Sequence, residues 1–189
     1  MTLGSFHRWI SQPRTQLSRT IAGCVRNHVQ ALRKKHPDLY GYALLPGEPY
    51  DIHSIVAAAN TATDIPVKPK HDQYSYYRYS VDEWAHYFHD GFDPANRLLV
   101  KLKHIFSAHH KADPDDYSMD EFELTFAATL FDAVVEALRS CRADRVFGER
   151  PPFLAVWIPD SDLPVIWKSV RVLNSRRVYK DFLTAFPKD

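Results

Sequence analysis

The first strong pattern of apolar positions runs from Gln12 to His36 and has the spacing of a helix. Side chains suited to a core recur every three or four residues, at Leu17, Ile21, Cys24, Val25, His28, Val29 and Leu32. Ser11 is placed to cap the first turn, Pro13 is tolerated within that turn, and Pro37 ends the pattern. The sequence therefore predicts an amphipathic helix over about residues 12–36.

Four short apolar or aromatic runs predict strands. The runs 39–45 and 51–60 flank a turn with Gly47 and two prolines, which is typical of a β-hairpin. The run 74–79 is rich in tyrosine, a residue favoured in sheets, and predicts a third strand. The run 153–158 follows two prolines and precedes another, and it predicts a buried fourth strand.

A second long helix is predicted over about residues 119–142. Ser118 and Glu121 have the spacing of a capping box at its start. Its apolar positions cover more than half of its circumference, so more than one neighbour should pack against it. These positions are Phe122, Phe126, Leu130, Phe131, Val134, Val135, Leu138 and Cys141. We therefore expect this helix to be the central one.

Shorter helices are predicted from the capping pair Ser80 and Glu83, after Asp93, and in two segments that follow the fourth strand. Because the first strands are linked as a hairpin, the sheet should be mainly antiparallel. The predicted fold class is α+β: about four strands packed with about five or six helices, in one domain spanning residues 1–189. The proline-containing loop 61–73 receives no role from its sequence.

Composition narrows the possible functions only modestly. The 189 residues are 45% hydrophobic and 25% charged, with a net charge of +1, which excludes a globally basic nucleic-acid binder but not a local basic patch. Two cysteines, Cys24 and Cys141, cannot form a disulfide framework or a cysteine-rich zinc site. No apolar run is long enough for a secretory signal or a membrane span. We therefore expect a cytoplasmic protein without a membrane partner.

The six glycines are isolated from one another, so neither a dinucleotide-binding fingerprint nor a P-loop can be built from them. No cofactor is expected for this reason.

Residues 74–93 hold the densest group of aromatic, histidine and acidic side chains. His86, His89 and Asp90 offer metal ligands, and His109, His110 or Asp113 could add another. The same segment also has a structural interpretation, since its rings suit a core and its polar residues suit helix caps. We favour the structural interpretation and expect no metal.

Asp160 and Asp162 follow the fourth predicted strand, a place where ligand-binding or catalytic carboxylates often lie. Acidic residues there are also suited to cap the next helix, and we favour that role.

The first helix carries a one-signed row of charge. Arg19, Arg26 and Arg33 are seven residues apart and therefore share one face, opposite the apolar stripe, and residues 1–37 contain no acid. Such a row can be a solvated face or a binding face for an acidic partner. The acidic segment 113–123 could meet it within the chain or in a second copy, so the oligomeric state stays open.

Six segments, in their order and spacing, carry a family resemblance: LYGYALL, AAANT, YYRYSVDEWAHY, DPANRLL, AVWIPDSD and VRVLNSRRVYKDF. From about residue 12 to its end, the chain resembles the bacterial family known as domain of unknown function 4303. That family has no established activity, so the resemblance implies no catalytic residue. Related small bacterial domains often accompany toxin genes as immunity proteins, which suggests such a role by analogy.

The favoured hypothesis is a non-catalytic module that binds an acidic protein through Arg19, Arg26 and Arg33, with an immunity-type role as one form of it. One alternative is a metal-dependent hydrolase that uses His86, His89 and nearby acids. Another, less favoured, is a nucleic-acid binder in which the arginine row works with Tyr74, Tyr76 and Tyr77 as stacking surfaces.

Overall fold

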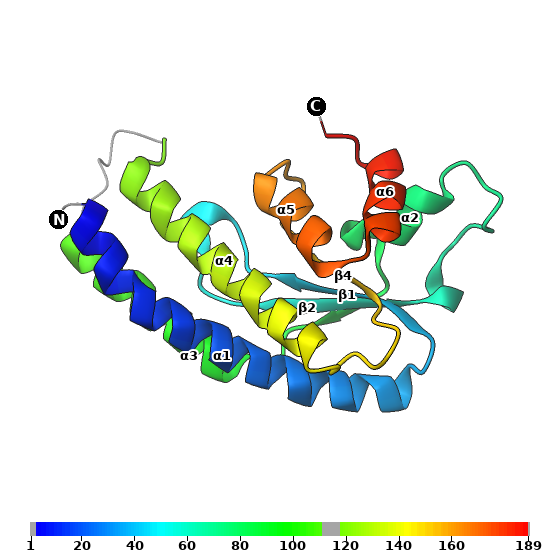
Figure 1. The fold of residues 1–189 in the computed structure, drawn as a ribbon, viewed down its shortest axis with the longest axis horizontal. Coiled ribbons are helices and arrows are strands. Elements are labelled where there is room, and N and C mark those ends of the chain that lie inside the picture. Colours follow the sequence, from blue (N-terminus) through cyan, green and yellow to red (C-terminus); the bar gives the residue numbers. More distant parts are fainter. Residues whose placement is uncertain (1–2, 111–117, 189) are drawn as a thin grey trace.

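The computed structural model describes residues 3–110 and 118–188, which form a four-stranded sheet covered by helices (Figure 1). The helices are α1 (Leu3–Lys35), α2 (Tyr74–Tyr79), α3 (Asp93–His109), α4 (Glu121–Ala143), α5 (Pro164–Leu173) and α6 (Arg176–Ala185). The strands are β1 (Leu39–Leu45), β2 (Val56–Thr61), β3 (His86–Phe88) and β4 (Phe153–Val156). Single 3-10 turns occur at η1 (Pro49–Asp51), η2 (Ala62–Asp64) and η3 (Val81–Glu83).

The sheet has the strand order β3-β2-β1-β4. β2 pairs antiparallel with both β1 and β3, as the hairpin pattern predicts, whereas β4 joins the far edge parallel to β1. The α+β class and the mainly antiparallel sheet are confirmed, and the parallel pairing of β4 makes the sheet mixed. None of the helices in the described ranges is long and apolar enough to cross a membrane.

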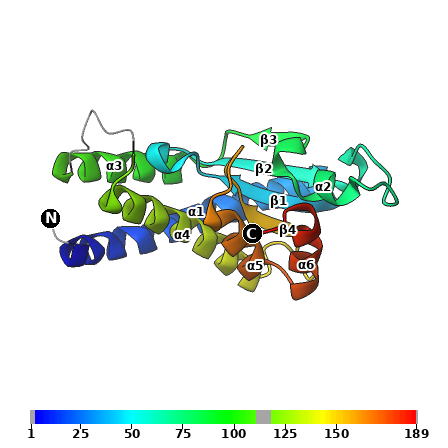
Figure 2. The same cartoon turned by 90° about the horizontal axis from the view of Figure 1, so that it is seen from above.

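The two faces of the sheet differ in side-chain size. Tyr42 is fully buried on the face that packs on α1, where its hydroxyl lies 2.9 Å from Nδ1 of His28. On the other face, Gly41 leaves room for the indole of Trp84, since a β-carbon at Gly41 would lie 2.7 Å from that ring. Helices α1 and α3 lie on the first side of the sheet, and α2, α5 and α6 lie on the other side (Figures 1 and 2).

Helix α1 begins nine residues earlier than predicted, so Pro13 lies inside the helix and not in its first turn. Phe6 and Ile10 are buried and continue the three- and four-residue spacing of the apolar stripe. Beyond the sheet this end of α1 packs on α3 and α4, with the ring of Phe6 5.9 Å from Phe106 and 6.4 Å from Phe126. Aromatic packing therefore covers the part of α1 that the sheet does not reach.

The central position of α4 is confirmed. Phe126, Leu130 and Val134 are buried, and the helix contacts α1, α5, β4 and η1. Its capping box is formed by Asp120 and Glu123, two residues later than the predicted pair.

The predicted strand at 74–79 is wrong, because these residues form α2. Tyr76 and Tyr79 are three residues apart and so share a helix face, on which Tyr76 packs against Phe186 and Tyr79 against Phe182 and Phe153. Packing on α6 and β4 thus outweighs the sheet preference of tyrosine. The helix expected from Ser80 is only the turn η3, and the third strand is β3.

Two other strand predictions differ in extent. The run 51–60 is a strand only from Val56, because η1 occupies its start, and the run 153–158 is a strand only to Val156. The amide of Trp157 still donates to the carbonyl of Leu44, so pairing with β1 continues one residue further.

Replacing Leu130 by alanine should lower the free energy of unfolding by about 2–5 kcal/mol, because the side chain is fully buried and a cavity would remain. Leu124→Ala is a matched control on the same helix, since Leu124 is 54% exposed, and it should cost less than about 1 kcal/mol. Urea unfolding of both variants measures the difference. Equal losses would contradict the central position of α4.

Acid should destabilise the protein partly through His28. Burial lowers the pKa of His28 in the folded protein, so the unfolded chain takes up a proton at higher pH than the folded one does. This contribution to stability is fully present above the unfolded pKa of about 6.5 and is lost as the pH falls toward the folded pKa, by at most about 1.4 kcal/mol per pH unit.

The comparison of thermal unfolding between pH 8 and pH 5 for the wild type and His28→Gln tests this effect. Glutamine can keep a hydrogen bond to Tyr42 but does not titrate, so the wild type should lose more stability over this range. Parallel curves for the two proteins would show that His28 makes no such contribution.

Candidate functional site

The predicted arginine row is exposed along α1, but it lies at the edge of the buried face rather than opposite it, because Arg19 and Arg26 line a hollow with the buried Ser18 and Ala22. Its neighbour there is α4. Nη2 of Arg26 lies 2.6 Å from Oδ2 of Asp144, at the end of α4. The guanidinium of Arg33 lies beside Gly148, where a β-carbon would come within 3.0 Å of Nη1 and Nη2. The row therefore borders a second helix that contributes charges of its own.

Two adjoining hollows between α1, α4 and the segment after α4 gather further arginines. One, of about 420 Å³, is lined by Arg14, Arg19 and Arg26 of α1 and by Arg139 of α4. The other, of about 370 Å³, is lined by Arg139, Arg142 and Arg145. Together with Arg33, these residues form the arginine surface: Arg14, Arg19, Arg26, Arg33, Arg139, Arg142 and Arg145.

Four of these arginines, Arg14, Arg139, Arg142 and Arg145, lie outside the row predicted from the sequence. Arg139 and Arg142 are three residues apart, a spacing that places two side chains on the same face of a helix. That spacing signals a shared face, but only the packing of α4 beside α1 shows that this face adjoins the row.

Three acids lie among these arginines, and each bridges one of them. The pairs are Asp144 with Arg26, Glu136 with Arg139, and Glu149 with Arg145, at 2.6 to 3.0 Å. Arg14, Arg19, Arg33 and Arg142 have no ion-pair partner within residues 3–110 and 118–188. The surface thus holds four guanidinium groups that can donate hydrogen bonds to carboxylates of a partner, whereas the other three are already paired.

The backbone of Arg145 is in the left-handed conformation, with φ of 56°. It ends α4 in a Schellman motif, in which the amide of Val146 donates to the carbonyl of Cys141 and that of Arg145 to Arg142. Glycine is the residue that favours this position, and a side chain there costs about 1–2 kcal/mol. An arginine is thus held at a strained helix end within the arginine surface.

His86, the first residue of the alternative enzyme site, is paired with Asp64. Nε2 of His86 lies 3.1 Å from Oδ2 of Asp64, and the ring of His36 lies 4.6 Å away. Burial pushes the pKa of Asp64 upward, but hydrogen bonds from the hydroxyl and amide of Thr61 and from His86 outweigh it and lower that pKa. Asp64 also caps η2, so its carboxylate has a structural role.

None of the other residues proposed for that site takes part in the His86–Asp64 pair. His89 and Asp90 are exposed in the bend after β3, so they and His86 do not lie on one helix. Asp160 and Asp162 are exposed after β4, and the capping role predicted for them is wrong, because the N-cap residue of α5 is Leu163 and no side chain caps that helix.

One neighbour of Asp160 is Asp82. Burial raises the pKa of Asp82, and the charge of Asp160 adds to that rise, although the hydrogen bond from the indole of Trp157 opposes it.

The tyrosines proposed to stack on bases have other contacts. Tyr74 accepts a hydrogen bond from Arg78, Tyr76 stacks on Phe186, and Tyr77 packs edge-on against Tyr76. They lie on α2, on the opposite side of the sheet from α1 (Figure 1). The structure therefore does not bring the arginine row and these rings to one surface.

The one group of three possible metal ligands within the described residues is His110, Asp120 and Glu123. The carboxylates of Asp120 and Glu123 each accept a backbone hydrogen bond in the capping box of α4. Nε2 of His110 lies 2.8 Å from Oδ2 of Asp120, a contact that lacks hydrogen-bond geometry. Asp113, one of the proposed ligands, lies outside the described residues.

This group cannot join His86. His110 packs on Phe106 beside Phe6, near the start of α1, whereas His86 packs on His36, just after its end. About 30 residues of helix separate these positions, or roughly 45 Å at 1.5 Å per residue. His109 and His110 are therefore not ligands of a site at His86.

We expect protein purified without a histidine tag to carry no stoichiometric transition metal, because Asp120 and Glu123 accept capping hydrogen bonds and His86 is paired with Asp64. Elemental analysis by mass spectrometry measures this, with His86→Ala and His110→Ala as paired variants. Stoichiometric zinc that is lost only in His86→Ala would overturn the structural interpretation of residues 74–93 and support the hydrolase alternative.

Comparison with known proteins places the chain in a family. Residues 21–175 match the family model described as domain of unknown function (DUF4303). No curated protein matches the chain, and no solved structure does. Because this match covers well over half of the chain, including all four strands and helices α2 to α5, the chain belongs to the DUF4303 family.

Proposed function

We propose that this protein is a non-catalytic binding module that holds an acidic surface of another protein on its arginine surface. The observation that supports this most is the set of four arginines without an ion-pair partner in the described ranges: Arg14, Arg19, Arg33 and Arg142. They stand on two helices that pack against each other, so their backbones are fixed before a partner arrives.

The chemistry of the surface suits carboxylates. A guanidinium group offers a planar fork that binds a carboxylate through two hydrogen bonds, and such charge-assisted pairs are among the stronger contacts in proteins. Because these side chains stand on packed helices, no loop has to be ordered when a partner binds.

The mixture of charges favours a protein over a nucleic acid. Glu136, Asp144 and Glu149 lie among the arginines and would repel a continuous phosphate backbone. A protein surface with both acids and bases can match such a pattern, and complementary patterns of charge give specificity.

An immunity-type role is a narrower form of this proposal. In that role the acidic partner is a toxin, and covering its surface is itself the function. It requires only tight, specific binding and no catalytic group in this chain.

Reversal of two unpaired arginines tests the proposal. In Arg19→Glu/Arg142→Glu, capture of a protein from a nuclease-treated extract of the native cell should fall at least tenfold relative to the wild type. Wild-type capture should weaken as salt rises, because screening acts on exposed charges. The variant should keep its stability to within about 0.5 kcal/mol per site, because both side chains lie outside the core.

The matched control is Arg176→Glu/Arg177→Glu, which changes the net charge equally at two exposed positions of α6. It should capture the same protein as the wild type does. If both double variants lost capture equally, the loss would follow from net charge alone and not from the arginine surface. If nuclease treatment abolished capture by the wild type, the partner would be a nucleic acid. Either result contradicts the proposal.

A further inference from the structure

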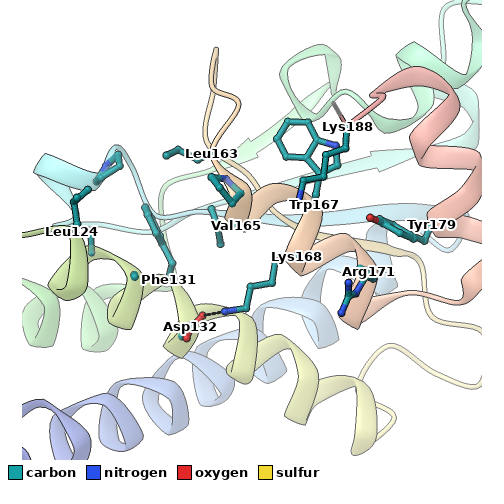
Figure 3. Close-up of a pocket in the computed structure, with 14 residues that line it drawn as sticks. Leu124, Phe131, Asp132, Leu163, Val165, Trp167, Lys168, Arg171, Tyr179 and Lys188 are labelled. Atoms are coloured by element: carbon teal, nitrogen blue, oxygen red, sulfur yellow. Dashed lines mark hydrogen bonds and ion pairs between the residues drawn. The ribbon is translucent and has the colours of Figure 1, made fainter. Parts of the chain in front are cut away.

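A separate pocket lies between α4, α5 and α6 and shares no residue with the arginine surface (Figure 3). Its volume is about 560 Å³, within the range of about 300–1,000 Å³ that is usual for small-molecule sites. Its walls also include Pro49 of η1 and Lys188 of the C-terminal segment.

One end of the pocket is apolar. Leu124 and Phe131 of α4 line it together with Leu163 and Val165 at the start of α5 (Figure 3). Leu124 is 54% exposed, so this large apolar side chain is left open to water in the absence of an occupant. Covering it would release water from apolar surface, which is favourable.

The other end is cationic. Arg171 of α5 and Lys188 of the C-terminal segment line it, beside Tyr179 of α6 (Figure 3). Lys168 also lines the pocket, but its ammonium group is paired with Asp132 at 2.7 Å. Arg171 and Lys188 have no ion-pair partner among the residues that the structure describes. The pocket therefore offers two uncompensated positive charges at one end only.

Aromatic contacts fix the segment that carries Lys188. The indole of Trp167 donates to the carbonyl of Phe186 at 3.1 Å. The ring of Phe186 stacks on Phe182 at 5.1 Å and packs edge-on against Trp157 at 5.5 Å. Lys188 follows Phe186 by two residues, so the packing of Phe186 places the backbone of Lys188 at the pocket.

We propose that this pocket binds a small amphipathic carboxylate. Its apolar body packs on Leu124 and Phe131, and its carboxylate is held by Arg171 and Lys188. The division of the pocket into one apolar and one cationic end supports this ligand, because charge at only one end matches a molecule with one charged head group. The eight residue-to-residue steps from Leu124 to Asp132 rise about 12 Å along the helix, comparable with an extended ten-carbon chain.

Titration calorimetry with decanoate, kept below its micelle concentration, tests this proposal on the full-length protein. Decanoate should bind at one site per chain, and its neutral counterpart 1-decanol should bind at least tenfold more weakly. Arg171→Gln should weaken decanoate about tenfold, since it removes a charge-assisted contact. Leu124→Ser should weaken decanoate and 1-decanol alike, because it removes apolar contact area.

Arg177→Gln is the matched control, because it removes an exposed arginine of α6 that does not line the pocket. It should leave the affinity for decanoate unchanged, and all variants should unfold within about 4 °C of the wild-type temperature. No binding of decanoate, equal binding of 1-decanol, or an unchanged affinity in Arg171→Gln would each overturn the proposal. A dimer that Leu124→Ser converts to monomer would overturn it too, since a second copy would then cover this face.

Discussion

The apolar stripe of α1 has to be covered along a helix of 33 residues, which is about 50 Å long. The longest strand, β1, has seven residues and spans only about 23 Å. The sheet can therefore cover only part of α1, and the remaining apolar side chains need other helices. Helices α3 and α4 supply that cover through the stacked rings of Phe106 and Phe126, which contact Phe6. The arrangement of the domain follows from this mismatch in length.

The same constraint places the two surfaces that we assign to binding. Because α4 has to pack on α1 along most of its length, the solvent-facing edges of the two helices adjoin, and their arginines form one surface. Because α4 also packs on β4 and α5, its other edge faces α5 and α6, where the pocket lies. A single helix thus borders both sites, through different side chains.

Local patterns in the sequence predicted the elements that are long and periodic. The apolar spacing of α1 and α4 was strong enough to identify both, and the hairpin of β1 and β2 followed from its turn residues. The tyrosine-rich α2 could not be predicted in this way, because contacts of Tyr76 and Tyr79 with distant rings decide its conformation. The arginine row on α1 was visible in the sequence, but its continuation to Arg142 depends on which helices pack together. The pocket was not visible, since its walls come from four separate segments.

The claim on which this account of function depends is that the junction of α1 and α4 contacts a protein partner. A benzophenone amino acid placed at Thr15, which is exposed in the first arginine-lined hollow, and irradiated in the native cell tests it most directly. The account predicts a covalent adduct with one acidic protein from position 15 and none from Lys180, an exposed control position on α6. No protein adduct from position 15, or an adduct with nucleic acid there, would contradict it.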